Sequence, residues 1–95
     1  MADLGRLTLA DFDGRVGEEF EAPALAHAWV LDSAIGLAMA GDGRSGFSLV
    51  FTGPLESAVE QGIVELLHAE LGELGLFVVP LGPRDDRMRY EAVFT

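Results

Sequence analysis

The chain has 95 residues, 49% hydrophobic and 23% charged, a composition typical of one globular domain with a modest core. Sixteen Asp and Glu residues oppose six Arg residues and no Lys, which gives a net charge of −10. A nucleic-acid-binding surface needs basic residues to neutralise phosphates, so we expect no DNA or RNA partner. The absence of Cys excludes disulfides and thiolate metal sites.

Targeting signals are weak. The N-terminal segment MADLGRLTLADF has neither the basic nor the long apolar region of a signal peptide. The Ala-rich segment 22–41 is interrupted by His27 and Asp32 and makes a poor membrane span. We therefore expect a single domain, residues 1–95, made in the cytoplasm and without a membrane partner.

A short helix is predicted over residues 8–16. Thr8 is placed as its N-cap, and Asp11, three residues later, completes a capping box. Leu9, Phe12 and Val16 follow at helical spacing and give the helix an apolar stripe, and a glycine follows at position 17, where it can end the helix.

The rest of the chain alternates large apolar and polar residues, which predicts strands. The expected strands cover residues 18–26, 29–39, 47–52, 62–69, 74–82 and 88–95. Six short antiparallel strands with one N-terminal helix indicate a mainly β fold, a small antiparallel barrel or sandwich. The side chains assigned to one common core are Phe47, Leu49, Phe51, Leu66, Leu76, Tyr90 and Phe94.

In the strand at 29–39, simple alternation separates two faces. The first carries Trp29, Leu31, Ile35, Leu37 and Met39; the second carries Val30, Asp32, Ala34, Gly36 and Ala38. The second face is small and only partly polar, and Pro23 suggests a sheet edge or a bulge nearby. A second chain could approach such a surface closely, so Ala34, Gly36 and Ala38 are candidate interface residues.

Several motifs suggest chemistry but have simpler interpretations. Residues 41–46, GDGRSG, match the GxGxxG pattern of dinucleotide-binding folds, but a strand follows them where that fold needs a helix, so a hairpin turn is favoured. Asp11 and Asp13 resemble part of a calcium loop whose later positions do not fit, and we interpret them as N-terminal helix charge.

The two histidines do not form a convincing metal site, because zinc needs three or four ligands around one point. His68, followed by Glu70, lies in line with apolar strand residues. It is expected to be a half-buried side chain bonded to the backbone of the turn at 70–72. No catalytic residue, metal or cofactor is predicted.

Half of the arginines lie in one short segment, RDDRMR (84–89). Arg84, Arg87 and Arg89 could offer guanidinium donors to a carboxylate on another surface. The alternative is a solvated turn with local ion pairs.

The segments LTLADF, FSLVFTGP, LxHxELGxLxLFVVPLGP and RYEAVF resemble a small family of uncharacterised bacterial domains. The resemblance covers residues 7–17 and 47–95. It implies no activity or cofactor, but it implies a neighbourhood of phage-tail-collar-type proteins, in which structural roles are common.

These observations favour a non-enzymatic structural or interaction module that self-associates as a homo-oligomer, with a phage-tail-like or filament-forming component as the specific version. Such a protein could act in an assembled or released particle. Its interface would include Ala34, Gly36, Ala38, Arg84, Arg87 and Arg89. The alternative is a small-ligand-binding β barrel, in which Trp29, Tyr90 and the phenylalanines line a cavity.

Overall fold

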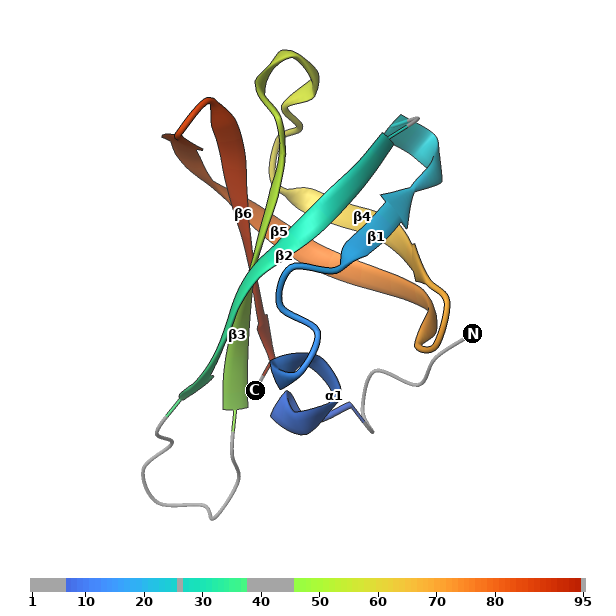
Figure 1. Cartoon of the computed structure of the whole chain (residues 1–95). Helices are drawn as coiled ribbons and strands as arrows, with labels where there is room; N and C mark the ends of the chain where they lie inside the picture. Colours follow the sequence, from blue (N-terminus) through green and yellow to red (C-terminus); the bar gives the residue numbers. More distant parts are fainter. Residues whose placement is uncertain (1–6, 26, 38–45, 95) are drawn as a thin grey trace.

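The computed structural model describes residues 7–25, 27–37 and 46–94. The described chain is mainly β, with one short helix at its start (Figure 1). The elements are α1 (Leu9–Asp13), β1 (Glu19–Ala22), the 3-10 turn η2 (Pro23–Leu25), β2 (His27–Leu37), β3 (Gly46–Pro54), the 3-10 turn η3 (Leu55–Ser57), β4 (Gly62–His68), β5 (Gly72–Arg84) and β6 (Arg87–Phe94).

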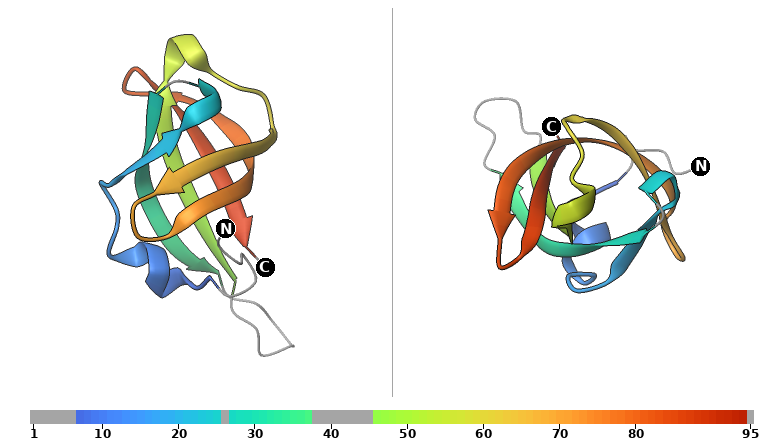
Figure 2. Two further views of the ribbon diagram at one scale, coloured as in Figure 1. Left: turned by 90° about the vertical axis from the view of Figure 1, so that its right-hand side faces the viewer. Right: turned by 90° about the horizontal axis from the view of Figure 1, so that it is seen from above.

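The strands form a closed antiparallel barrel in the order β1-β2-β3-β6-β5-β4, so the barrel prediction is confirmed. Seen from above, the strands make a ring (Figure 2). β1 closes the ring against β4 through the register pair Glu21 and Leu67. β2 is hydrogen-bonded on both sides, to β1 and β3. The suggested sheet edge beside Pro23 is therefore wrong: β1 ends at Ala22, Pro23 starts η2, and closure removes the free edge.

Helix α1 covers one end of the barrel (Figures 1 and 2) and is shorter than predicted. The Asp11 carboxylate accepts the Thr8 backbone N–H at 2.8 Å, as expected for the capping box. Gly17, with φ +95°, donates its N–H to the Leu31 carbonyl of β2 at 2.8 Å. The chain has thus left the helix to join the barrel, and Val16, predicted on the apolar stripe, is exposed. Asp13 is the last helical residue and not an N-terminal charge.

The barrel interior is one continuous apolar core. Six of the seven predicted core residues are buried; Phe94 is half-buried at the α1 end, where its ring stacks on that of Phe47 with centroids 4.5 Å apart. Phe12 of α1 reaches the same end and lies 5.8 Å from Phe47 between ring centroids. The large side chains buried completely or nearly so are Trp29, Tyr90, Phe12, Phe20, Phe51, Leu31, Leu49, Leu66, Leu74, Leu76 and Val78.

A bulge in β2 exchanges the faces of the residues from Ser33 to Gly36. Leu31 pairs with Phe51, but the next pair is Ser33 with Val50, so Asp32 is an extra residue. Because side chains alternate with period two, one extra residue exchanges the two faces. Ile35, predicted inward, is 57% exposed, and Ala34, predicted outward, packs against the core.

β5 is divided between two neighbours. Its first half, from Gly72 to Val78, pairs with β4, and its second half, from Val79 to Arg84, pairs with β6. Leu76 points inward as predicted and is 2% exposed. A register shift between Pro80 and Gly82 makes Leu81 a bulged residue near the end of the strand.

Candidate interaction surfaces

Of the predicted interface residues of β2, the structure describes Ala34 and Gly36, and both lie on the side of the strand toward the core and α1. Ala34 packs against the barrel core. Gly36 faces α1, because a Cβ atom there would stand 3.3 Å from Cδ2 of Leu9. Ala38 lies outside the described residues. The bulge at Asp32 turned these residues toward the interior. The small size of Gly36 lets Leu9 of α1 of the same molecule approach closely.

The predicted arginines do come together. Arg84, Arg87 and Arg89 line a hollow of about 310 Å³ on the outside of the barrel, together with Asp32, Thr52 and Asp85. The β5–β6 hairpin that carries these arginines projects from the end of the barrel opposite α1 (Figures 1 and 2). We call this feature the arginine hollow.

Two of the three guanidinium groups differ in how they are held. Arg87 donates from Nε to the Thr52 hydroxyl at 3.2 Å and from Nη2 to the Thr52 carbonyl at 3.1 Å, which ties it to β3. Arg89 has a buried Nε without a hydrogen-bond partner among the described residues. Its unpaired donor makes the hollow incomplete as a hydrogen-bonded structure.

The hairpin turn beside the hollow is conformationally costly. Asp85 and Asp86 both have positive φ, at 52° and 65°, a combination found in two-residue type I′ turns. Arg84 and Arg87 face each other as the register pair that closes this turn. Like charges placed directly opposite destabilise a hairpin, so the turn gathers positive charge at the expense of stability.

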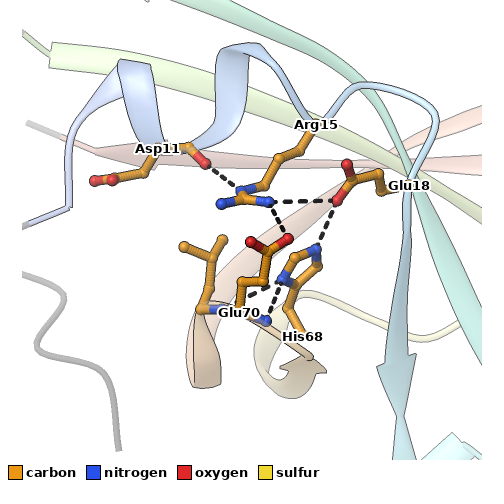
Figure 3. A network of polar contacts seen from close by, with 6 residues as sticks. Asp11, Arg15, Glu18, His68 and Glu70 are labelled. Carbon is orange, nitrogen blue, oxygen red and sulfur yellow. Dashed lines mark hydrogen bonds and ion pairs between the residues drawn. The ribbon is translucent and has the colours of Figure 1, made fainter.

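A second polar cluster joins α1 to the β4–β5 hairpin (Figure 3). His68 Nε2 lies 2.7 Å from the Glu18 carboxylate, and Nδ1 accepts the backbone N–H groups of Glu70 and Leu71 at 3.1 and 3.3 Å. Because Nδ1 accepts, the proton resides on Nε2 and is donated to Glu18. The expected bond from His68 to the turn at 70–72 is confirmed.

Arg15 completes this cluster. Its Nη1 donates to Glu70 at 2.9 Å and lies 3.7 Å from Glu18, while its Nε donates to the Asp11 carbonyl at 2.9 Å. Both ring nitrogens of His68 are engaged, and the ring packs on Phe20 with centroids 4.6 Å apart. The arrangement fastens α1 to the barrel and leaves the imidazole no free nitrogen for a substrate.

An exposed apolar surface was missed by the sequence reasoning. Phe77, Val79 and Leu81 point outward along β5 and are 55%, 38% and 40% exposed. Ile63 of β4, the register partner of Phe77, is 74% exposed. We call these four residues the β5 stripe. The sequence does show large apolar residues on both faces of the strand at 74–82. Alternation alone does not show which of the two faces is covered by the rest of the fold.

The aromatic residues proposed to line a ligand cavity instead contact one another. Trp29 and Tyr90 stack with ring centroids 4.2 Å apart and planes 7° apart. Phe51 lies 6.2 Å from Trp29 and 5.3 Å from Phe20, and all four side chains are fully buried. Their packing fills the space between them, which gives the ligand-barrel alternative no support from these residues.

The GDGRSG motif lies outside the described residues except for Gly46, which begins β3. The strands on either side pair antiparallel, with Leu37 opposite Gly46. Within the described ranges, no group of three or more His, Asp or Glu side chains is arranged to hold a metal ion. No helix in the same ranges has the length and apolar character needed to cross a membrane.

Fold and surfaces together define a small closed β barrel with a filled core, an apolar outer stripe and an arginine-lined hollow. The chain belongs to the family described as Domain of unknown function (DUF6916), whose model matches residues 7–94. Comparison with curated proteins and with solved structures gives no match.

Proposed function

We propose that this protein is a non-enzymatic interaction module that self-associates through the β5 stripe. The observation that carries the proposal is the group of large apolar side chains, Ile63, Phe77, Val79 and Leu81, exposed on adjoining strands. Exposed apolar residues that adjoin one another, unlike ones scattered singly, mark interaction sites.

A second copy of this chain is the partner that fits the geometry. The barrel is closed, so association cannot proceed by adding a strand to a free edge of the described sheet. A stripe that follows one strand can pack against the same stripe of another copy about a twofold axis, because such an interface uses one patch twice. Face-to-face packing of two sheets buries alternate side chains of this kind.

The charge of the chain opposes this contact. At a net charge of −10, two copies repel each other, and salt screens that repulsion over a Debye length of about 8 Å at physiological ionic strength. We therefore expect self-association to strengthen as salt rises.

The resemblance to domains found near phage-tail-collar-type proteins supports a more specific proposal. We extend the self-association to a structural component of a phage-tail-like or filamentous assembly, made in the cytoplasm and acting in the assembled or released particle. Electron microscopy of concentrated samples tests this extension, which predicts regular particles or fibres.

Sedimentation velocity over a range of protein concentrations tests the main proposal. The parent should show a mass above the 10.1 kDa monomer that rises with concentration. Phe77→Lys should stay monomeric, because a charge in an apolar contact is costly. Lys also reduces the net negative charge, so a loss of association could not come from added repulsion.

Val16→Lys is the matched control. Val16 is 50% exposed near α1 and lies outside the β5 stripe, and the substitution changes the charge by the same amount. It should associate as the parent does. A parent that remains monomeric at every concentration, or a Phe77→Lys variant that associates as well as the parent, contradicts the proposal.

A further inference from the structure

The arginine hollow concentrates positive charge on an acidic molecule. The structure describes four arginines, and three of them, Arg84, Arg87 and Arg89, line this one hollow. Asp32 and Asp85 line the same hollow. Three guanidinium groups and two carboxylates therefore give its lining a formal charge of +1. The hollow can therefore balance one further negative charge.

The hollow's hydrogen bonding is also unfinished. The Thr52 hydroxyl accepts the Arg87 Nε–H, which leaves its own proton to donate. Arg89 Nε is buried and has no acceptor in the described part of the chain, and a buried donor without an acceptor costs free energy. Arg84 is exposed. Among the described residues its one ion-pair partner is the neighbouring Asp85, with Nε and Oδ2 3.8 Å apart.

We propose that the arginine hollow is a binding site for a carboxylate group. A planar carboxylate matches the fork of a guanidinium and can accept two parallel hydrogen bonds from it. Arg89 offers its Nε and Nη groups when its side chain turns toward the hollow, and the Thr52 hydroxyl supplies a further donor. Arg87, held by Thr52, contributes fixed positive charge, and Arg84 closes over the bound group from the hairpin.

The charge of the hollow selects a carboxylate over a phosphate. A single carboxylate neutralises the formal charge of the lining, whereas a dianionic phosphate would meet Asp32 and Asp85 with an excess of negative charge. The hairpin fits this role as well, since a bound anion relieves the repulsion between Arg84 and Arg87 across the turn. This site is separate from the β5 stripe and does not depend on it.

Acetate is the probe for the test. The protein labelled with ¹⁵N is titrated with sodium acetate at constant ionic strength, with sodium chloride as the balancing salt. NMR spectra follow the Thr52 backbone amide and the arginine Nε–H resonances. The Thr52 and Arg89 signals should shift and saturate, while the Arg15 signal, from the α1 end of the barrel, should not move.

Two conservative variants locate the site. Arg89→Lys keeps the charge but loses the fork, so acetate should bind at least about tenfold more weakly, judged from the Thr52 amide. Arg15→Lys makes the same change at the other end of the barrel and should bind as the parent does. If Arg89→Lys fails to give a folded spectrum, Thr52→Val, which removes the hydroxyl donor, replaces it and should also weaken binding.

The remaining outcomes decide the ligand and its source. Three results would overturn the proposal. The chemical-shift changes could grow linearly with acetate concentration without saturating, or the folded Arg89→Lys or Thr52→Val variant could bind acetate as tightly as the parent does. Inorganic phosphate could also bind more tightly than acetate. If acetate also lowers the sedimenting mass of the parent, the natural carboxylate is an acidic side chain of a second copy. If the mass is unchanged, the site takes a carboxylate from a free acid. Both of these results support the site.

Discussion

Gly53 of β3 lies directly against the indole of Trp29: a Cβ atom on Gly53 would stand 2.5 Å from Nε1 and 2.6 Å from Cδ1 of the ring. The ring of Trp29 is also held by Tyr90, on which it stacks with ring centroids 4.2 Å apart. Glycine is therefore required here for space, because Trp29 of β2 lies against Gly53 of β3 and stacks on Tyr90 of β6.

Gly53→Ala should lower the free energy of unfolding by about 1 to 3 kcal/mol, because the added methyl group overpacks the core. Gly14→Ala is the control, since nothing lies within 4 Å of its Cβ position. That substitution should be neutral or slightly stabilising. Urea unfolding monitored by Trp29 fluorescence measures both. Equal stability of the two variants would show that the indole has room to shift.

Phe51→Ala and Phe77→Ala separate the two sides of the barrel. Phe51 is fully buried, so its truncation should lower the free energy of unfolding by about 3 to 5 kcal/mol. That loss is a large part of the stability of so small a domain. Phe77 is 55% exposed, and its truncation should cost about 1 kcal/mol or less in the monomer. Thermal unfolding at low protein concentration distinguishes them. A larger loss for Phe77 would mean that its side of β5 faces the core.

His68→Phe tests the fastening of α1. Phenylalanine keeps the packing on Phe20 but offers no acceptor to the Glu70 and Leu71 N–H groups, so unfolding should become easier by about 1 to 3 kcal/mol. Glu18→Gln retains an oxygen that accepts from His68 Nε2, so it should lower the free energy of unfolding much less than His68→Phe does. Hydrogen exchange of the Glu70 and Leu71 amides reports the lost bonds directly. Unchanged exchange in His68→Phe would contradict their assignment.

Asp86 tests the strain of the β5–β6 turn. With φ at 65°, this residue occupies a conformation that glycine adopts without a steric cost. Asp86→Gly should therefore stabilise the protein by about 0.5 to 1 kcal/mol, and Asp86→Ala should destabilise it by a similar amount. The difference in Tm between these two variants is the measurement. Identical Tm values would indicate that the turn relaxes at no cost.

Features that depend on neighbouring residues in the chain could be predicted from the sequence. The cap is formed by Thr8 and Asp11, three positions apart in the chain, and its prediction is confirmed. The inward positions Phe47, Leu49 and Phe51 follow from uninterrupted alternation within one strand. The arginines are close together in the sequence, and the structure places them around one hollow. Their predicted part in an interface stays a prediction.

Features that depend on pairing between strands were decided by the tertiary structure. The extra residue at Asp32 is defined by the ladder that β2 makes with β3, and it turned Ala34 inward and Ile35 outward against the local pattern. The exposure of Phe77 depends on which face of β5 the closed barrel covers. Alternation divides a strand into two faces, but closure of the sheet and the register of each ladder determine which face meets the core and where the faces exchange.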